Sequence, residues 1–306
     1  MRCCFDTSDY TGVPDTEPCP QTLDVPAIIR GLDALYAESR EDEAQVYLER
    51  ARDQAREAGD WRAELSLTSE LLGQYRRSMD AAKGLAAVDA ALALVKTHGL
   101  GRTVSGATVL LNAATTLGCF GEAADSLPIF RHVSRVYADT LDPGDYRFAS
   151  LFNNMAQSHA ALGEFEEAEK LFRAAIRIME TLPGGGCEIA VSFCSLAEMF
   201  DAHDPEDPRI ADCLEEAWAA LGDTALPRGG YYAFMASKCL PVFDRLGFFL
   251  YAKELQERID DIHARTGRGA AVFSRARRGD APRALPRIRA ADRRRSRRAR
   301  LAVLWL

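Results

Sequence analysis

Apolar residues recur along this chain with the spacing of amphipathic helices, most clearly between residues 151 and 178. One predicted helix face carries Phe152, Met155, Ala156, His159 and Leu162. Gly163 follows as a turn former, and a second apolar stripe begins at Ala168. Because these positions follow the 3.6-residue period, the segment predicts two helices joined by a short turn.

The second predicted helix carries a motif that recurs along the chain: a small residue, a large residue four positions later and a small residue three positions after that. It reads Ala168, Phe172, Ala175 here, and it recurs as Ala44, Leu48, Ala51; Gly84, Val88, Ala91; Ala123, Leu127, Phe130; Ile210, Leu214, Ala217; and Ala252, Gln256, Ile259. Successive motifs start 40, 39, 45, 42 and 42 residues apart. This period predicts an all-α solenoid of six helical hairpins, with twelve helices and no sheet, over residues 25–263.

These residues resemble the tetratricopeptide repeat family, whose unit has small residues in the first helix and at two positions of the second. The match lies in Ala156, Gly163, Phe165, Ala168, Phe172 and Ala175. The long period resembles the repeats of the kinesin light chain type. The resemblance implies a right-handed superhelix whose concave wall is lined by the first helix of each hairpin.

Two prolines fall inside predicted helices. Pro128 lies early in the second helix of one hairpin, and Pro241 lies in the first helix of the last hairpin. Because proline lacks an amide hydrogen, we expect the first of these helices to start after Ser126 and the other to kink.

The two ends differ from the repeat region, which gives three segments: an irregular leader (1–24), the repeats (25–263) and a tail (264–306). Residues 265–306 contain fourteen Arg, no Lys and two Asp, a net charge of +12, whereas the whole chain carries −7. Three interpretations of the tail stay open. It is a basic arm that binds nucleic acid through phosphates, a solvated tail, or an out-of-frame translation of a GC-rich gene.

The sequence offers little support for catalysis, a metal or a cofactor. It contains no CxxC pair, and the nearest ligand cluster is His203, Asp204 and Cys213. It also lacks a nucleophile elbow, a Walker loop and an HExxH motif. We therefore predict a non-enzyme with reduced thiols. Without a secretory signal or a long apolar run, a cytoplasmic protein that does not enter membranes is expected.

The resemblance places polar residues of the first helices in the concave groove. The predicted peptide-binding residues are Asn112, Asn153, Asn154, Gln157, Arg76, Arg77, Glu198 and Lys238. Carboxamides donate and accept hydrogen bonds, so they suit the main chain of an extended peptide. Asn112, Asn153 and Gln157 are expected to line one continuous concave surface, with Asn154 beside it. Joint replacement of Asn112 and Asn153 by alanine is expected to leave the fold intact, because neither belongs to the core stripe.

The leading hypothesis is a scaffold that binds a protein or peptide segment along this face. The alternative is a peptide-sensing repeat domain of a transcription regulator, although no DNA-binding helix-turn-helix is evident in residues 1–24. A third hypothesis, that the chain is an enzyme, would need titratable groups clustered in a cleft. Because the residues before the tail are acidic and the groove charges are mixed, a basic or neutral peptide is the expected partner, and nucleic acid would bind only through the tail.

Overall fold

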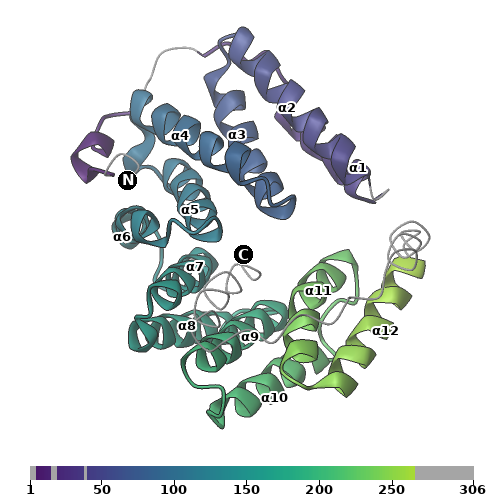
Figure 1. The fold of residues 1–306 in the computed structure, drawn as a ribbon. Coiled ribbons are helices and arrows are strands. Elements are labelled where there is room, and N and C mark those ends of the chain that lie inside the picture. Colours follow the sequence, from purple (N-terminus) through teal and green to yellow (C-terminus); the bar gives the residue numbers. More distant parts are fainter. Residues whose placement is uncertain (1–4, 15–18, 38–39, 266–306) are drawn as a thin grey trace, which may run out of the picture. The chain divides into compact units, whose positions relative to one another are not determined.

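The computed structural model describes residues 5–14, 19–37 and 40–265, and the regular structure in these ranges is entirely helical (Figure 1). The chain divides into two compact units, residues 1–143 and residues 144–306. The first unit contains η1 (Thr7–Tyr10), α1 (Val25–Ala37), α2 (Glu41–Glu57), α3 (Trp61–Arg77), α4 (Ala81–Thr97), η2 (Leu100–Arg102), α5 (Val104–Cys119) and α6 (Ala123–Thr140). The second contains α7 (Tyr146–Leu162), α8 (Phe165–Glu180), α9 (Gly186–His203), α10 (Arg209–Gly222), α11 (Gly230–Arg245) and α12 (Phe249–Arg265). The predicted twelve helices are confirmed, and the described residues contain no strand. Residues 264 and 265, assigned to the tail, end α12, and the rest of the tail (266–306) lies outside the described residues.

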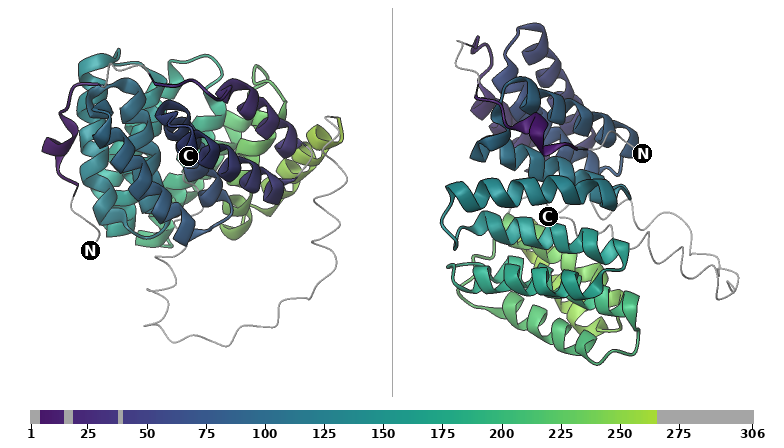
Figure 2. Two further views of the ribbon diagram at one scale, coloured as in Figure 1. Left: turned by 90° about the horizontal axis from the view of Figure 1, so that it is seen from above. Right: turned by 90° about the vertical axis from the view of Figure 1, so that its left-hand side faces the viewer.

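The helices pair as hairpins in which each odd-numbered helix is followed by its even-numbered partner. Within the second unit, α7 packs on α8, α8 on α9 and α9 on α10, so that the four lie side by side (Figures 1 and 2). Gly163 ends α7 in the left-handed conformation, with φ of 83°. The next amide, of Glu164, then donates to the His159 carbonyl at 2.9 Å. This bond satisfies a carbonyl that the helix end would otherwise leave open.

The repeated motif forms the contact between the helices of each hairpin. Its small first residues include Ala44 and Ala168, both fully buried, and its large residues include Leu48 and Phe172, which are at most 1% exposed. Three residues depart from the motif: Ile210 and Gln256 are half-buried, whereas Phe130, which stands in a small position, is fully buried. The period found in the sequence therefore reports helix-to-helix packing.

Both prolines lie inside continuous helices. The helix that contains Pro128 begins at Ala123, so the expected start after Ser126 is wrong. The Ser126 amide bonds to the Glu122 carbonyl and its hydroxyl donates to the Ala123 carbonyl at 2.7 Å. These bonds stabilise the first turn, so the amide missing at Pro128 does not delay it. Helix α11 continues through Pro241, and the kink expected there stays a prediction.

The described part of the leader, which the sequence predicted only as irregular, packs against helices of the first unit. Tyr10 is buried, and its ring centre lies 4.4 Å from that of Phe5 and 6.0 Å from that of His132. Further along, the Asp60 carboxylate caps α3 and accepts the Thr22 amide at 2.8 Å. Isolated contacts of this kind leave no period in the sequence, which is why the pattern did not predict them.

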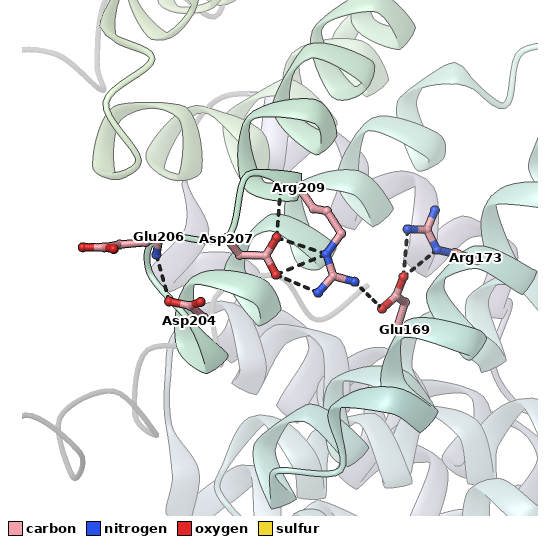
Figure 3. A network of polar contacts seen from close by, with 6 residues as sticks. All are labelled: Glu169, Arg173, Asp204, Glu206, Asp207 and Arg209. Carbon is pink, nitrogen blue, oxygen red and sulfur yellow. Dashed lines mark hydrogen bonds and ion pairs between the residues drawn. The ribbon is translucent and has the colours of Figure 1, made fainter.

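An ion-pair network ties the start of α10 to α8 (Figure 3). The Arg209 guanidinium binds the Asp207 carboxylate at 2.7 Å and the Glu169 carboxylate at 3.1 Å. Glu169 also binds Arg173 at 2.8 Å, and Arg209 lies over the Phe200 ring at 4.0 Å. Asp207 and Glu169 are therefore paired with arginines, and these pairs hold neighbouring helices together. No helix of the described residues is long and apolar enough to cross a membrane.

Candidate functional site

In the first unit, polar side chains join the odd-numbered helices to one another. The Tyr36 hydroxyl of α1 donates to the Gln74 carboxamide of α3 at 2.6 Å. The Asn112 Nδ2 of α5 donates to the Ser69 hydroxyl of α3 at 2.9 Å. Asn112 is half-buried, so its carboxamide lies at the edge of the α3–α5 contact with part of its surface exposed.

Arg76 and Arg77, at the end of α3, have different environments. The Arg76 Nη1 donates to the Thr116 hydroxyl at 2.8 Å and to the Asn112 carbonyl at 3.3 Å. Burial lowers the pKa of the Arg76 guanidinium to about 10, so it remains charged at neutral pH. Arg77 is exposed and lies 4.3 Å from the centre of the Tyr36 ring. Of the two arginines, Arg77 therefore presents the more exposed charge.

In the second unit, a polar seam runs between α7 and α9. The Asn153 Oδ1 accepts a bond from the Ser192 hydroxyl at 3.0 Å, and its Nδ2 has no hydrogen-bond partner in the described part of the chain. About one turn further along α7, a small cavity opens between the two helices. It is lined by Gln157, Ala160, Phe172, Ser195 and Glu198. Two predicted site residues, Gln157 and Glu198, are thus brought together.

Glu198 connects this seam to α11. Its carboxylate Oε1 forms a close ion pair with Arg245, which also binds Asp201 at 3.3 Å. Glu198 is only 6% exposed. Burial raises its pKa to about 7, although Arg245 opposes the change. One arginine on α11 therefore faces two acids on α9, and one of these acids titrates near neutral pH.

The remaining predicted residues lie beside the seam or away from it. Asn154 is 2% exposed, next to Asn153 on α7. Lys238, on α11, lies with its ammonium 4.9 Å from the centre of the Phe234 ring. Phe234 and Tyr231 expose about half of their surface on the same helix. Asn112 belongs to the first unit and the other predicted carboxamides to the second, so a single surface shared by all of them stays a prediction.

The expectation that Asn153 lies outside the core is wrong. Its side chain is 1% exposed, and Gln157 is 4% exposed. Neighbouring odd-numbered helices approach closely enough to cover the polar stripe between them, so these carboxamides are buried among helices. Replacement of Asn153 would therefore disturb packing as well as any bound partner.

Sequence reasoning also missed the partners of these side chains. Thr115 lies on the polar stripe by its helical spacing, yet it is fully buried and its hydroxyl donates to the Leu111 carbonyl of the same helix. The neighbouring Thr116 hydroxyl accepts a bond from Arg76. Ser192 and Ser195 do not stand out in the sequence, because a serine in a helix is common on any face. The recurrence of polar residues on the odd-numbered helices was the signal that could have pointed to Ser192 and Ser195 as partners.

The titratable groups near the seam include a histidine that is paired with an acid. His159 is buried, and its Nδ1 lies 2.5 Å from the carboxylate of Glu164, the residue that directly precedes α8. Among the described residues, no three His, Cys, Asp or Glu side chains are grouped so that they could hold a metal ion. The described cysteines are free thiols, and the ring of His203 packs on Phe165. What the site offers is hydrogen-bonding groups and charge.

Comparison with known proteins supports the repeat. Residues 148–182 match the model of the tetratricopeptide repeat family, which confirms the resemblance predicted from this hairpin. No curated protein matches the chain. Among solved structures, the chain is similar to BtubC (BKLC) from P. vanneervenii, at 16% identity and a TM-score of 0.48, covering 81% of this chain and 97% of that one. It is also similar to nearly identical TPR-like repeats of a putative kinesin light chain from Podosopora anserina, at 18% identity and a TM-score of 0.46, covering 67% and 97%.

Proposed function

We propose that this chain is an interaction scaffold that binds a protein or peptide segment along the polar faces of its odd-numbered helices. One observation carries the proposal: polar side chains join neighbouring odd-numbered helices in both units, and at the α3–α5 contact the Asn112 carboxamide keeps part of its surface exposed. Asn153 bonds to Ser192 on α9, Gln157 and Glu198 line one cavity, and Glu198 pairs with Arg245 on α11.

Such a series suits recognition of an extended segment. Where such a group stays partly exposed, as Asn112 does at the edge of the α3–α5 contact, a bound segment can exchange hydrogen bonds with it. The first unit repeats the arrangement with Asn112, Ser69 and Arg76. Stacked helical repeats bind partners through extended faces of this kind. The proposal assigns no reaction to the chain.

Selection from a library of short random peptides tests the proposal and requires only the folded protein. The protein should enrich a consensus sequence, and Asn112→Ala should weaken binding of the selected peptide about threefold to tenfold, the effect of one net hydrogen bond. Gln54→Ala is the matched control, because it removes an exposed carboxamide from the even-numbered helix α2. Fluorescence polarisation measures the affinities, and circular dichroism checks folding.

Two results would count against the scaffold. Failure of the folded protein to enrich any peptide would remove the proposed function. Equal affinities of wild type, Asn112→Ala and Gln54→Ala would place binding on a face other than that of the odd-numbered helices.

A further inference from the structure

One edge of the Arg76 guanidinium, near the end of α3, has no protein partner. Its Nη1 donates to the Thr116 hydroxyl and to the Asn112 carbonyl of α5, and both acceptors are neutral. The described part of the chain offers no hydrogen-bond acceptor to Nε or Nη2, and Arg76 forms no ion pair there. The hydrogens of these two nitrogens point the same way, so they form the planar fork with which a guanidinium binds a pair of anionic oxygens.

This open edge, formed by Nε and Nη2, reaches solvent. Arg76 is half-buried, and neither nitrogen belongs to the buried side-chain atoms that lack a hydrogen-bond partner in the described residues. Both nitrogens therefore keep exposed surface, and a group from solvent can approach them.

Gly73, about one helical turn before Arg76 on α3, leaves space beside the open edge. A Cβ at Gly73 would meet only the Arg76 Nη2, 3.9 Å away, apart from the backbone of its own helix. Packing therefore does not require glycine here, although glycine weakens the interior of a helix relative to alanine. The bare backbone instead leaves the space next to Nη2 unfilled, as it does where a ligand approaches closely.

The charge of Arg76 has no anionic partner within bonding distance in the described residues. Burial lowers the pKa of its guanidinium to about 10, and of its charged neighbours on α3, Arg77 lowers the pKa whereas Glu70 raises it. Glu70 thus acts on Arg76 through space, without an ion pair. Hydrogen bonds to a charged group are stronger in a partly dehydrated site than in water. An oxyanion at the open edge would therefore stabilise the charged form of Arg76.

We propose that the open edge of Arg76 binds an oxyanion of the bound segment, a carboxylate or a phosphate group, since both present a pair of oxygens to a guanidinium fork. Gly73 provides the space, while the bonds to Asn112 and Thr116 hold the guanidinium in position. The assignment rests on the proposed function, because the anion belongs to the segment that the scaffold binds. That segment would carry an acidic group at this point whatever its overall charge.

Separate titrations with sodium acetate and sodium phosphate test the site by nuclear magnetic resonance, with sodium chloride holding the ionic strength constant. The Nε resonance of Arg76, assigned by its loss in Arg76→Lys, should shift in a saturable way. One bidentate charged contact corresponds to a dissociation constant on the order of 10–100 mM. Neutral acetamide should not reproduce the shift. Tighter binding of acetate would identify an acidic side chain or chain end as the source of the anion, and tighter binding of phosphate a phosphorylated side chain.

Two variants report on the site through the backbone amide of Arg77, which all of them retain. Gly73→Leu fills the space beside Nη2 and should weaken anion binding at least about tenfold. Ser66→Leu is its matched control, because it adds the same side chain at an exposed position of α3 about two turns away.

Arg76→Lys keeps the charge but loses the fork, so it should weaken binding about threefold to tenfold. Arg30→Lys, at an exposed arginine of α1, is its control. If Arg76→Lys does not fold, Gly73→Leu still tests the site, because it leaves Arg76 and its bonds to α5 in place and leucine favours a helix more than glycine does.

The outcomes separate the oxyanion site from the scaffold itself. No saturable shift with either anion up to about 300 mM, or equal affinities of wild type and the folded variants, would overturn the site and leave peptide binding unaffected. If the anions bind but peptide selection enriches no sequence, the scaffold fails, and the assignment of the anion to a bound segment fails with it. Enriched peptides with an acidic residue whose replacement by its amide lowers affinity for wild type but not for Gly73→Leu would support both.

Discussion

Burial of Glu198 should make the second unit less stable as the pH rises toward neutrality. Its carboxyl is protonated in both the folded and the unfolded states below its ordinary pKa of 4.5, and it is ionised in both above its folded-state pKa of about 7. Between these values the folded state binds the proton more tightly. A tenfold difference in proton affinity corresponds to about 1.4 kcal/mol, so the stability lost across this window is about 3 kcal/mol.

Glu198→Gln removes this titration while keeping the shape of the side chain. We compare wild type with the variant by the difference between their free energies of unfolding, wild type minus variant, in which the contributions of all other groups cancel. This difference should fall by about 3 kcal/mol from about pH 4.5 to about pH 8. Above pH 7 the variant should be the more stable protein, since a carboxamide is buried at lower cost than a carboxylate whose single guanidinium partner is shared with Asp201.

Urea unfolding at a series of pH values provides the measurement. Trp218 lies in α10, where its ring stacks on Tyr251 at 4.4 Å, and its fluorescence reports on the second unit once Trp61 and Trp305 are replaced by Phe. Glu188→Gln controls for removal of a charge from α9. A difference between wild type and Glu198→Gln that does not vary with pH would refute the argument that burial governs this carboxyl.

Three further perturbations test the packing. Met79→Gly should stabilise the first unit by up to about 1 kcal/mol in urea unfolding, because Met79 has φ of 54° and glycine adopts that conformation without strain; unchanged or lower stability would contradict this. Gly84→Ala should destabilise it by about 1–3 kcal/mol, since a Cβ there would lie 2.4 Å from the Phe120 ring, and Phe120→Leu added to it should recover part of the loss. Deletion of residues 266–306 should change the stability of the repeats by less than about 1 kcal/mol, because that segment has no amphipathic stripe; loss of the Trp218 unfolding transition would contradict this.

The hairpins could be predicted because their determinants are local and periodic. Ala168 and Phe172 are one helical turn apart, and each packs against the helix that directly precedes it, so the pattern in the sequence and the contact in the structure have the same origin. The Schellman-type turn at Gly163 is likewise encoded by one residue and its neighbours. The number of helices in the described residues and the class of fold therefore followed from the sequence. The core stripe predicted for α7 did so only in part, because Ala156 and His159 are buried, whereas Leu162 is 38% exposed and Phe152 and Met155 are half-buried.

The site depended on contacts between residues far apart in the chain. Glu198 and Arg245 are 47 positions apart, and Asn153 and Ser192 are 39 apart. A helical period places a residue on a face, but the distance between two odd-numbered helices decides whether that face is exposed or covered. That distance buried Asn153, Gln157 and Glu198, and it raised the pKa of the Glu198 carboxyl, which the sequence placed among the residues of the groove. Thus the sequence by itself determined the helices and their pairing, while only the tertiary structure decided which polar groups meet, because their meeting depends on packing between hairpins.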